Sequence, residues 1–246
     1  MSVNIPIINA RLSYVNGLNL AWASATTFTM AAGAASNSTD INDIELPALV
    51  TNTITSVGPN GVDIAPAVLN SFYAVYVIGD STKYKPTASL LSLNATAPRL
   101  PFGYDMYRRV GFVLTNGSAN ILKFWQYGNN SERTMYYDVG ISELAVGAAT
   151  TFTAIDLATS VPPVKCQVIF DVSFTPDGAT EFAEFLPFGS TATNGIIRFG
   201  TGVAGAQVGT VVVPSALDAA VPKVLYKVAS GDTLTLFTVG YIDSLV

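Results

Sequence analysis

The sequence contains no histidine in its 246 residues. Imidazole is the usual general base near neutral pH and a common zinc ligand. Its absence excludes Ser-His-Asp and Cys-His nucleophile systems and most zinc sites. There is a single cysteine, Cys166, so no disulfide can form within the chain. Cys166 lies in the alternating segment Lys165–Phe170, which favours a small buried side chain over a catalytic thiol.

Charged residues are also scarce, at 12% of the chain against about 25% in ordinary soluble domains. The net charge is −5 and the basic residues are scattered, so we expect no binding to nucleic acid. We also expect no secretory signal, because no cationic segment and apolar stretch follow Met1. A surface this poor in charge is typical of a chain whose neighbouring subunits cover much of it.

Hydrophobic residues make up 50% of the chain, but no uninterrupted apolar run reaches the roughly 18 residues of a membrane-spanning helix. We therefore expect no membrane insertion. The apolar residues instead follow the spacing of β-strands, as in Phe72–Ile78, and no segment sustains a period of 3.6 residues. This pattern predicts an all-β protein.

Short β-rich runs separated by turn signals dominate the second half of the chain. They are Met135–Val139, Thr150–Leu157, Cys166–Phe174, Phe182–Phe188, Gly195–Phe199, Gln207–Val213, Lys223–Val228 and Leu234–Tyr241. Such spacing is typical of antiparallel, jelly-roll-like sandwiches. The polar cluster Gly128–Ser131 resembles a linker. We therefore predict two antiparallel β-sandwich domains, covering residues 1–133 and 134–246.

The segment Tyr107–Gly128 has two apolar runs on either side of Asn116-Gly117, a dipeptide suited to a tight type I′ turn. We predict a β-hairpin in which Phe112 lies opposite Ile121 and Arg108 opposite Trp125. A cation–π pair between Arg108 and Trp125 would contribute about 0.5–2 kcal/mol. The pairing predicts that replacing Trp125 with alanine lowers the melting temperature.

Several segments of the first half resemble β-structured virion proteins of tailed bacteriophages, of the tail-fibre, head-fibre or capsid-decoration type. The segments are Asn16–Leu18, Ser24–Thr27, Ala32–Ala35, Asn42–Ile44, Phe72–Ile78, Leu100–Tyr104 and Tyr107–Gly111. The second half is similar to phage modules that pair Asp156-Leu157 and Val161–Pro163 with a closing Val239–Tyr241 strand.

The resemblance implies a protein on the exterior of the capsid or tail, made in the cytoplasm of the bacterial host. It implies a homo-oligomer, with a trimer favoured, and contacts with major capsid or tail proteins. Fibre shafts carry repeated sequences, and this chain lacks them, so a compact knob, adaptor or capsid-surface protein is favoured. The resemblance does not distinguish a position on the head from one on the tail.

Two motifs raise the question of a cofactor or a metal. Gly200–Gly205 matches Gly-x-Gly-x-x-Gly, but β-branched residues rather than a helix follow it, so we interpret it as a loop without a dinucleotide site. Asp40, Asp43 and Glu45 could supply oxygen ligands to calcium, but they lack the EF-hand spacing, which favours a solvated acidic loop. We predict no cofactor and no metal.

Four carboxylates and three aromatic clusters remain as candidates for a site. Asp171, Asp177, Glu181 and Glu184 could include the acid and base of a glycosidase, but their spacing does not establish the required separation. The aromatic clusters are Phe124–Tyr127, Tyr136–Tyr137 and Tyr104–Tyr107. Exposed rings could stack on sugars, whereas rings in strands more often belong to cores or subunit contacts. No catalytic residues are assigned.

Three functional hypotheses follow from the sequence. The leading one is a non-enzymatic virion protein that self-assembles on the particle exterior. The second is a receptor-binding module that recognises host surface polysaccharide. The third is a polysaccharide-degrading tail enzyme, which the lack of histidine and of a catalytic signature places last.

Overall fold

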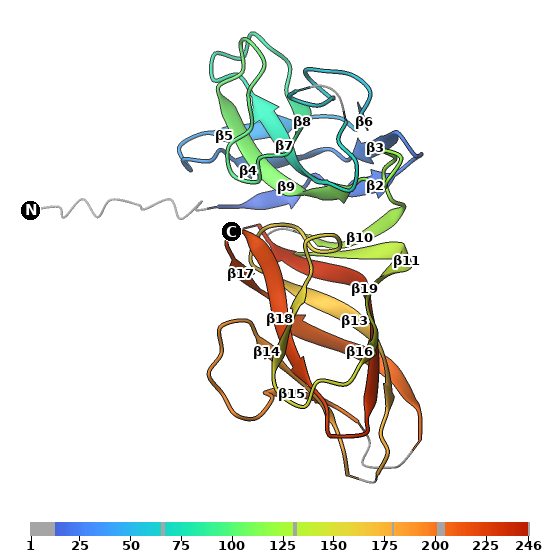
Figure 1. The fold of residues 1–246 in the computed structure, drawn as a ribbon. Coiled ribbons are helices and arrows are strands. Elements are labelled where there is room, and N and C mark those ends of the chain that lie inside the picture. The colour runs from blue at the N-terminus through green and yellow to red at the C-terminus, as the bar shows by residue number, and fades with distance from the viewer. Residues whose placement is uncertain (1–12, 65–66, 130–131, 179, 201–204, 246) are drawn as a thin grey trace, which may run out of the picture.

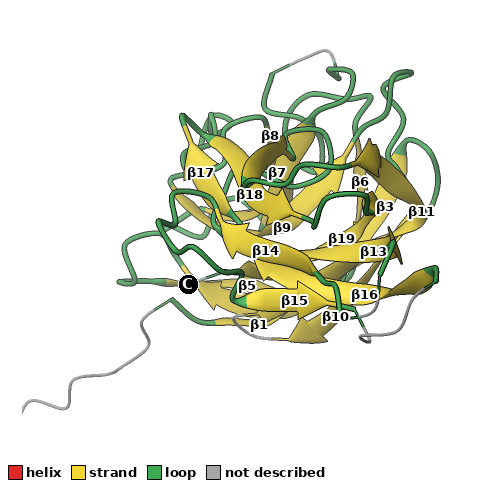
Figure 2. Cartoon of the chain, turned by 60° about the horizontal axis from the view of Figure 1, so that its bottom comes forward, coloured by secondary structure: helices red, strands yellow, loops and turns green. Residues whose placement is uncertain are grey.

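The computed structural model describes residues 13–245, apart from 65–66, 130–131, 179 and 201–204. Every regular element in this part of the chain is a β-strand, as Figure 2 shows by the colour of its arrows. The all-β prediction is therefore confirmed. The strands are gathered in two units, which lie one above the other in Figure 1.

The N-terminal unit consists of three antiparallel three-stranded sheets. The first has the order β1 (Val15–Gly17), β4 (Gly33–Ser36), β5 (Asp43–Leu46). The second has the order β2 (Leu20–Trp22), β3 (Thr27–Met30), β6 (Val50–Thr53). The third has the order β8 (Ala88–Ser92), β7 (Phe72–Gly79), β9 (Met106–Leu114).

Strand β7 forms the centre of this unit because its sequence is apolar on both faces. All eight residues of β7 are buried, with β8 on one side and β9 on the other. β5 contacts β7, and β6 contacts β8, so the first and second sheets pack against the third. A continuous apolar run is the pattern expected of a strand covered on both faces.

The C-terminal unit consists of two larger antiparallel sheets. The first has the order β10 (Phe124–Asn129), β11 (Glu132–Gly147), β19 (Thr233–Ser244), β13 (Cys166–Thr175), β16 (Gln207–Pro214). The second has the order β12 (Thr153–Asp156), β18 (Val221–Lys227), β14 (Ala183–Pro187), β15 (Ile197–Phe199), and β17 (Ala216–Asp218) pairs with β18. The rings of Phe170 on β13 and Phe185 on β14 stack with centroids 6.3 Å apart, so the two sheets face each other there.

The strand order of the C-terminal unit is that of a jelly roll. We take β11 to β16, β18 and β19 as strands one to eight. The first sheet then contains strands one, eight, three and six, and the second contains two, seven, four and five. Consecutive strands alternate between the sheets, except at the β14–β15 hairpin. Two interlocked Greek keys give this order, and β10 extends the first sheet at its edge.

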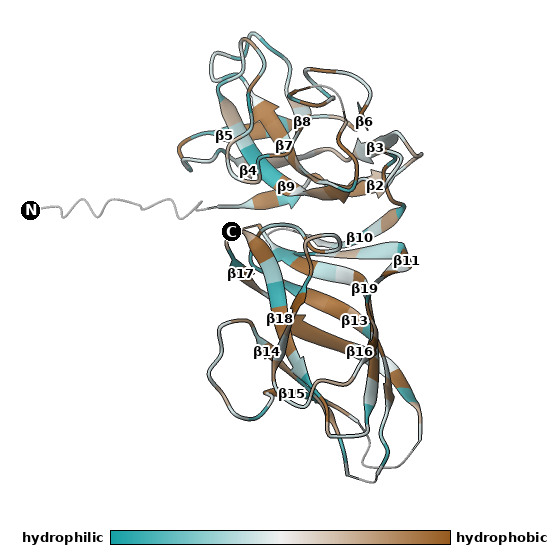
Figure 3. Ribbon diagram, in the orientation of Figure 1, coloured by the Kyte–Doolittle hydropathy of each residue, from teal (hydrophilic) through white to brown (hydrophobic). Residues whose placement is uncertain are grey.

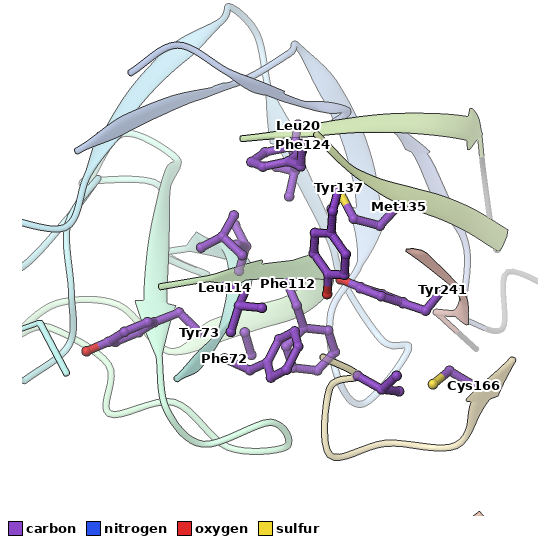
Figure 4. Packing of buried hydrophobic residues seen from close by; sticks show 14 of the residues in the cluster. Leu20, Phe72, Tyr73, Phe112, Leu114, Phe124, Met135, Tyr137, Cys166 and Tyr241 are labelled. Carbon is purple, nitrogen blue, oxygen red and sulfur yellow. The ribbon is translucent and has the colours of Figure 1, made fainter. Parts of the chain in front are cut away.

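The two units share one continuous apolar core. Figure 4 shows side chains of both units in contact, among them Phe72 and Phe112 from the N-terminal unit and Tyr137 and Tyr241 from the C-terminal unit. The rings of Phe72 and Tyr241 meet edge to face at 6.4 Å. Figure 3 shows hydrophobic residues concentrated on β7, β13 and β16. The units are therefore packed together as well as linked in sequence.

The predicted hairpin over Tyr107–Gly128 is wrong both in its strand pairing and in its turn type. β9 pairs with β7, and β10 pairs with β11, so only the bridge between Thr115 and Ile121 joins the two arms. The turn carries its positive φ at Ala119 rather than at Asn116 or Gly117. β9 and β10 each pair with another strand over a longer stretch than the two arms share with each other. Long-range pairing therefore overrides the local turn signal.

β9 belongs to a sheet of the N-terminal unit and β10 to a sheet of the C-terminal unit. The sequence predicted a domain boundary at 133/134. The polar cluster at 128–131 begins within β10 and ends just before β11, and these two strands pair from Phe124 opposite Tyr137 to Asn129 opposite Glu132. The cluster therefore separates two strands of one sheet. The chain passes from one unit to the other in the segment after Thr115 instead.

Candidate functional site

The glycine-rich motif joins one strand to another. β15 ends at Phe199 and β16 begins at Gln207, so a strand follows the motif, as predicted, where a dinucleotide site requires a helix. Residues 201–204 of the motif lie outside the described residues. Gly200 and Gly205, the described ends of the motif, both lie outside the strands, as the interpretation as a loop predicts.

Asp40, from the acidic loop of the first half, is engaged in an ion pair with Arg108. It also accepts hydrogen bonds from the Ser36 hydroxyl at 2.6 Å and from the Ser13 amide at 2.9 Å. The Ser36 hydroxyl, the Ser13 amide and Arg108 together lower the pKa of Asp40 despite some desolvation. Asp43 and Glu45 alternate with buried residues along β5. The loop is therefore organised around an arginine.

This ion pair also corrects the predicted contact between Arg108 and Trp125. Arg108, on β9, makes its contacts within the N-terminal unit, where it donates to Ser36 and Asn37 in addition to Asp40. Trp125 instead contacts Lys123, whose ammonium group lies 5.0 Å from the centre of the indole ring.

The four carboxylates considered for glycoside chemistry do not form one group. Asp171 is exposed on β13, where it pairs with Thr210 and Phe237 in the first sheet. Glu184 on β14 accepts from the Gly195 amide and forms ion pairs with Lys227 at 3.4 Å and Arg198 at 3.6 Å. Asp177 and Glu181 do come together, but with a third carboxylate that the sequence reasoning did not select.

That third carboxylate is Asp232, and we name the trio Asp177, Glu181 and Asp232 the acidic cluster. One carboxylate oxygen from each residue lies within 4.8 Å of the others. Asp232 is completely buried, at 0% exposure. Its Oδ1 accepts from the Asp177 amide at 2.9 Å, while its buried Oδ2 has no hydrogen-bond partner among the described residues.

Backbone geometry holds the acidic cluster together. The Gly178 amide donates to Glu181 Oε2 at 2.8 Å. Gly231 has φ +98°, and a Cβ at this position would lie 1.9 Å from Asp177 Oδ2. Only glycine therefore allows this backbone conformation and the close approach of the carboxylate.

The proximity of the three carboxylates changes the proton affinity of Glu181. The Gly178 amide lowers the pKa of its carboxyl group, but desolvation and the neighbouring carboxyls of Asp232 and Asp177 outweigh that effect. The net result is a pKa raised above the usual value. Glu181 also lines an open groove with Glu184, Lys227 and Ser230, so this member of the acidic cluster is accessible from solution.

The topology explains why the acidic cluster forms. β13 and β19 are neighbours, and Thr175 at the end of β13 is paired with Thr233 at the start of β19. The β13–β14 turn, which carries Asp177, therefore lies beside the β18–β19 turn, which carries Asp232. The signal available in the sequence was an acidic residue within each of two turn motifs, Pro-Asp-Gly and Ser-Gly-Asp.

Strand alternation divides two of the aromatic clusters between the core and the surface. Phe124 and Tyr137 are buried, and the Tyr137 hydroxyl donates to the Ser160 carbonyl at 2.6 Å. Their neighbours Trp125 and Tyr136 are 42% and 37% exposed. In the third cluster, Tyr107 packs against Tyr76 with ring centroids 5.7 Å apart.

The exposed rings belong to two rows of residues that cross the outer face of the first sheet of the C-terminal unit, the sheet of β10, β11, β19, β13 and β16. One row is Trp125, Tyr136, Gly240, Ile169 and Val212, and the other is Tyr127, Thr134, Ile242, Gln167 and Pro214. We call them the outer rows. Neither contains a charged residue. Ile169 is buried, but it is not part of the core cluster. A residue that points away from the core is expected to lie outside that cluster.

Comparisons with protein-family models, curated proteins and solved structures found no match for this chain. Within the described ranges, no helix is long and apolar enough to cross a membrane.

Proposed function

We propose that the protein is a structural component of a bacteriophage particle that associates with copies of itself through the outer rows. The observation that supports the proposal is two rows of five paired positions, each crossing all five strands of the sheet, without a charged side chain. Uncharged faces with exposed tyrosine and tryptophan are typical of subunit contacts. A jelly roll is also an architecture used by viral capsid domains.

In this proposal the work of the protein is mechanical. The outer rows are buried against sister subunits, with a trimer as the favoured assembly, and the remaining surface contacts capsid or tail proteins on the exterior of the virion. The N-terminal unit is packed against the jelly roll through the shared core. A load on one unit is therefore transmitted to the other.

The test is analytical ultracentrifugation of the wild-type chain and of the double variant Tyr136→Lys/Val212→Lys. We expect the wild type to sediment as an oligomer at micromolar concentration and the double variant as a monomer, because association would bury two unpaired ammonium groups. Phe102→Lys is the matched control, since Phe102 is 98% exposed in a loop away from the outer rows. A monomeric wild type would refute self-association.

The position on the particle requires a second measurement. Gold-labelled antibody against the chain, applied to virions of the phage that encodes it, would place it on the head or the tail. Absence of label from every virion would contradict the virion proposal while leaving self-association intact.

A polysaccharide-binding function is the second candidate, because three exposed aromatic side chains lie close together. Tyr127 and Tyr136 meet at 5.9 Å, and Trp125 is paired with Tyr136. Aromatic rings stack on the apolar faces of sugars. Retention on host cells that is lost in Trp125→Ala/Tyr127→Ala, with the oligomer unchanged, would favour this candidate. Release of reducing ends from host polysaccharide would indicate the enzyme hypothesis instead.

A further inference from the structure

The acidic cluster has the properties of a cation site. Three carboxylates that converge within a few ångströms repel one another unless a proton or a cation lies between them. Elsewhere in the described chain, buried Asp243 and half-buried Asp40 form ion pairs with Arg109 and Arg108. Buried Asp80 has no ion pair, but both of its oxygens accept hydrogen bonds, from Thr82 and from the Lys85 amide. No cationic partner is found for the acidic cluster among the described residues.

The nearest candidate for a compensating charge is already engaged. Lys227 lines the same groove, but its ammonium group contacts Glu184 at 3.4 Å and donates to the Thr193 carbonyl at 3.1 Å. The Asp232 Oδ2 atom is buried without a hydrogen-bond partner. A buried, unpartnered carboxylate oxygen beside two further carboxylates points to a ligand that supplies positive charge.

The separation of the oxygens fits a calcium ion. Calcium holds oxygen ligands at about 2.3–2.6 Å, so ligands on opposite sides of one ion are up to about 4.6–5.2 Å apart. The three oxygens lie within 4.8 Å of one another, which is inside this range. Magnesium demands a near-ideal octahedron and is usually bound by only one or two carboxylates, so three converging carboxylates suit calcium better.

The backbone also orients the carboxylates. The Asp177 and Gly178 amides each bind one oxygen of a carboxylate, Asp232 Oδ1 and Glu181 Oε2. Asp232 Oδ2 is thereby left for a further ligand. Gly231 allows the Asp177 carboxylate to pack directly on the β18–β19 turn. Two turns far apart in sequence thus present a preformed set of oxygen donors.

We propose that Asp177, Glu181 and Asp232 bind one calcium ion, which ties the β13–β14 turn to the β18–β19 turn at one end of the jelly roll. Asp177 is exposed and Glu181 is partly exposed, so affinity in the range of extracellular modules is expected, with a dissociation constant on the order of 10⁻⁴ to 10⁻³ M. The inference does not depend on self-association.

Isothermal titration of the EDTA-treated full chain with calcium chloride, together with thermal melting, tests the site. We expect one calcium bound per chain and a higher melting temperature in calcium than in EDTA. Asp232→Asn and Glu181→Gln should weaken binding by about tenfold or more, because each removes a ligand charge. Asp171→Asn, an exposed change on β13 away from the acidic cluster, should bind as the wild type does.

The melting of Asp232→Asn in EDTA separates a metal site from a purely structural carboxylate. Removal of one like charge should leave this variant at least as stable as the wild type in EDTA, although it no longer responds to calcium. Should Asp232→Asn fail to fold, Glu181→Gln, at a partly exposed position, provides the same comparison. No binding by the wild type, or equal binding by Asp232→Asn, would overturn the proposal, and a response to magnesium alone would overturn the choice of ion.

Discussion

Arg133 joins the two units, and its replacement by alanine should strongly destabilise the fold. The side chain comes from β11 and is 2% exposed. Its Nη1 donates to the Leu18 carbonyl at 2.8 Å and to Gln126 Oε1 at 3.1 Å, and its Nη2 donates to the Gly17 carbonyl. Gln126 Oε1 in turn accepts from the Leu20 amide at 2.7 Å. One guanidinium group therefore satisfies backbone carbonyls of the N-terminal unit from within the jelly roll.

The size of the effect follows from two opposing contributions. Leaving the Gly17 and Leu18 carbonyls unpaired costs about 1–3 kcal/mol each, and a cavity adds to this. Against it, the arginine is itself desolvated: burial lowers its pKa to about 10, although Asp243 partly offsets the shift. Its Nε also has no hydrogen-bond partner among the described residues. We expect a net loss of about 3–5 kcal/mol.

Calorimetry of Arg133→Ala should accordingly show a melting temperature lower by about 6–20 °C, since 1 kcal/mol corresponds to about 2–4 °C in a chain of this size. Arg198→Ala is the matched control, because Arg198 is half-exposed and contacts Glu184 at 3.6 Å. That change should alter stability by no more than about 1 kcal/mol. A loss for Arg133→Ala as small as that of the control would refute the role assigned to the buried guanidinium group.

Two further predictions concern residues that the sequence already singled out. Phe124→Ala should lower the free energy of unfolding by about 3–5 kcal/mol because Phe124 is buried, whereas Trp125→Ala should lower it far less because Trp125 is on the outer face. Equal losses in urea denaturation would contradict this assignment of faces. Burial raises the pKa of the Cys166 thiol to about 12. A thiol-specific reagent should therefore label the native chain at pH 8 far more slowly than the urea-unfolded chain. Equally fast labelling of the two would show that Cys166 is accessible.

The sequence was sufficient for fold class but not for strand pairing. The alternation in Cys166–Thr175 and the apolar run in β7 both appear in the structure as strands with the expected burial. The partner of β9, by contrast, is β7 and not the adjacent β10. Side-chain period reveals which residues form a strand, but pairing depends on burial against distant strands, which no local window contains.

The same limit applies to the candidate sites. Alternation predicts that Phe124 and Trp125 point in opposite directions, but which of the two is buried depends on the packing of β10 against the N-terminal unit. Asp177 and Asp232 are 55 residues apart, and their hydrogen bond exists only because β13 and β19 are neighbours. A carboxylate cluster that is built by topology leaves no spacing motif in the sequence.

The placement of β19 has a consequence for how the chain is made. β19 comes last among the strands in sequence, yet it lies between β11 and β13, and Asp243 near its end is the partner of Arg109. On the ribosome, the sheets of the N-terminal unit need only β1 to β9 and can form first. The jelly roll must wait, with the facing edges of β11 and β13 unpaired, until translation delivers β19. Unpaired edges recruit other strands. The interval before release of β19 is therefore when nascent chains are most exposed to mispairing and most in need of a chaperone.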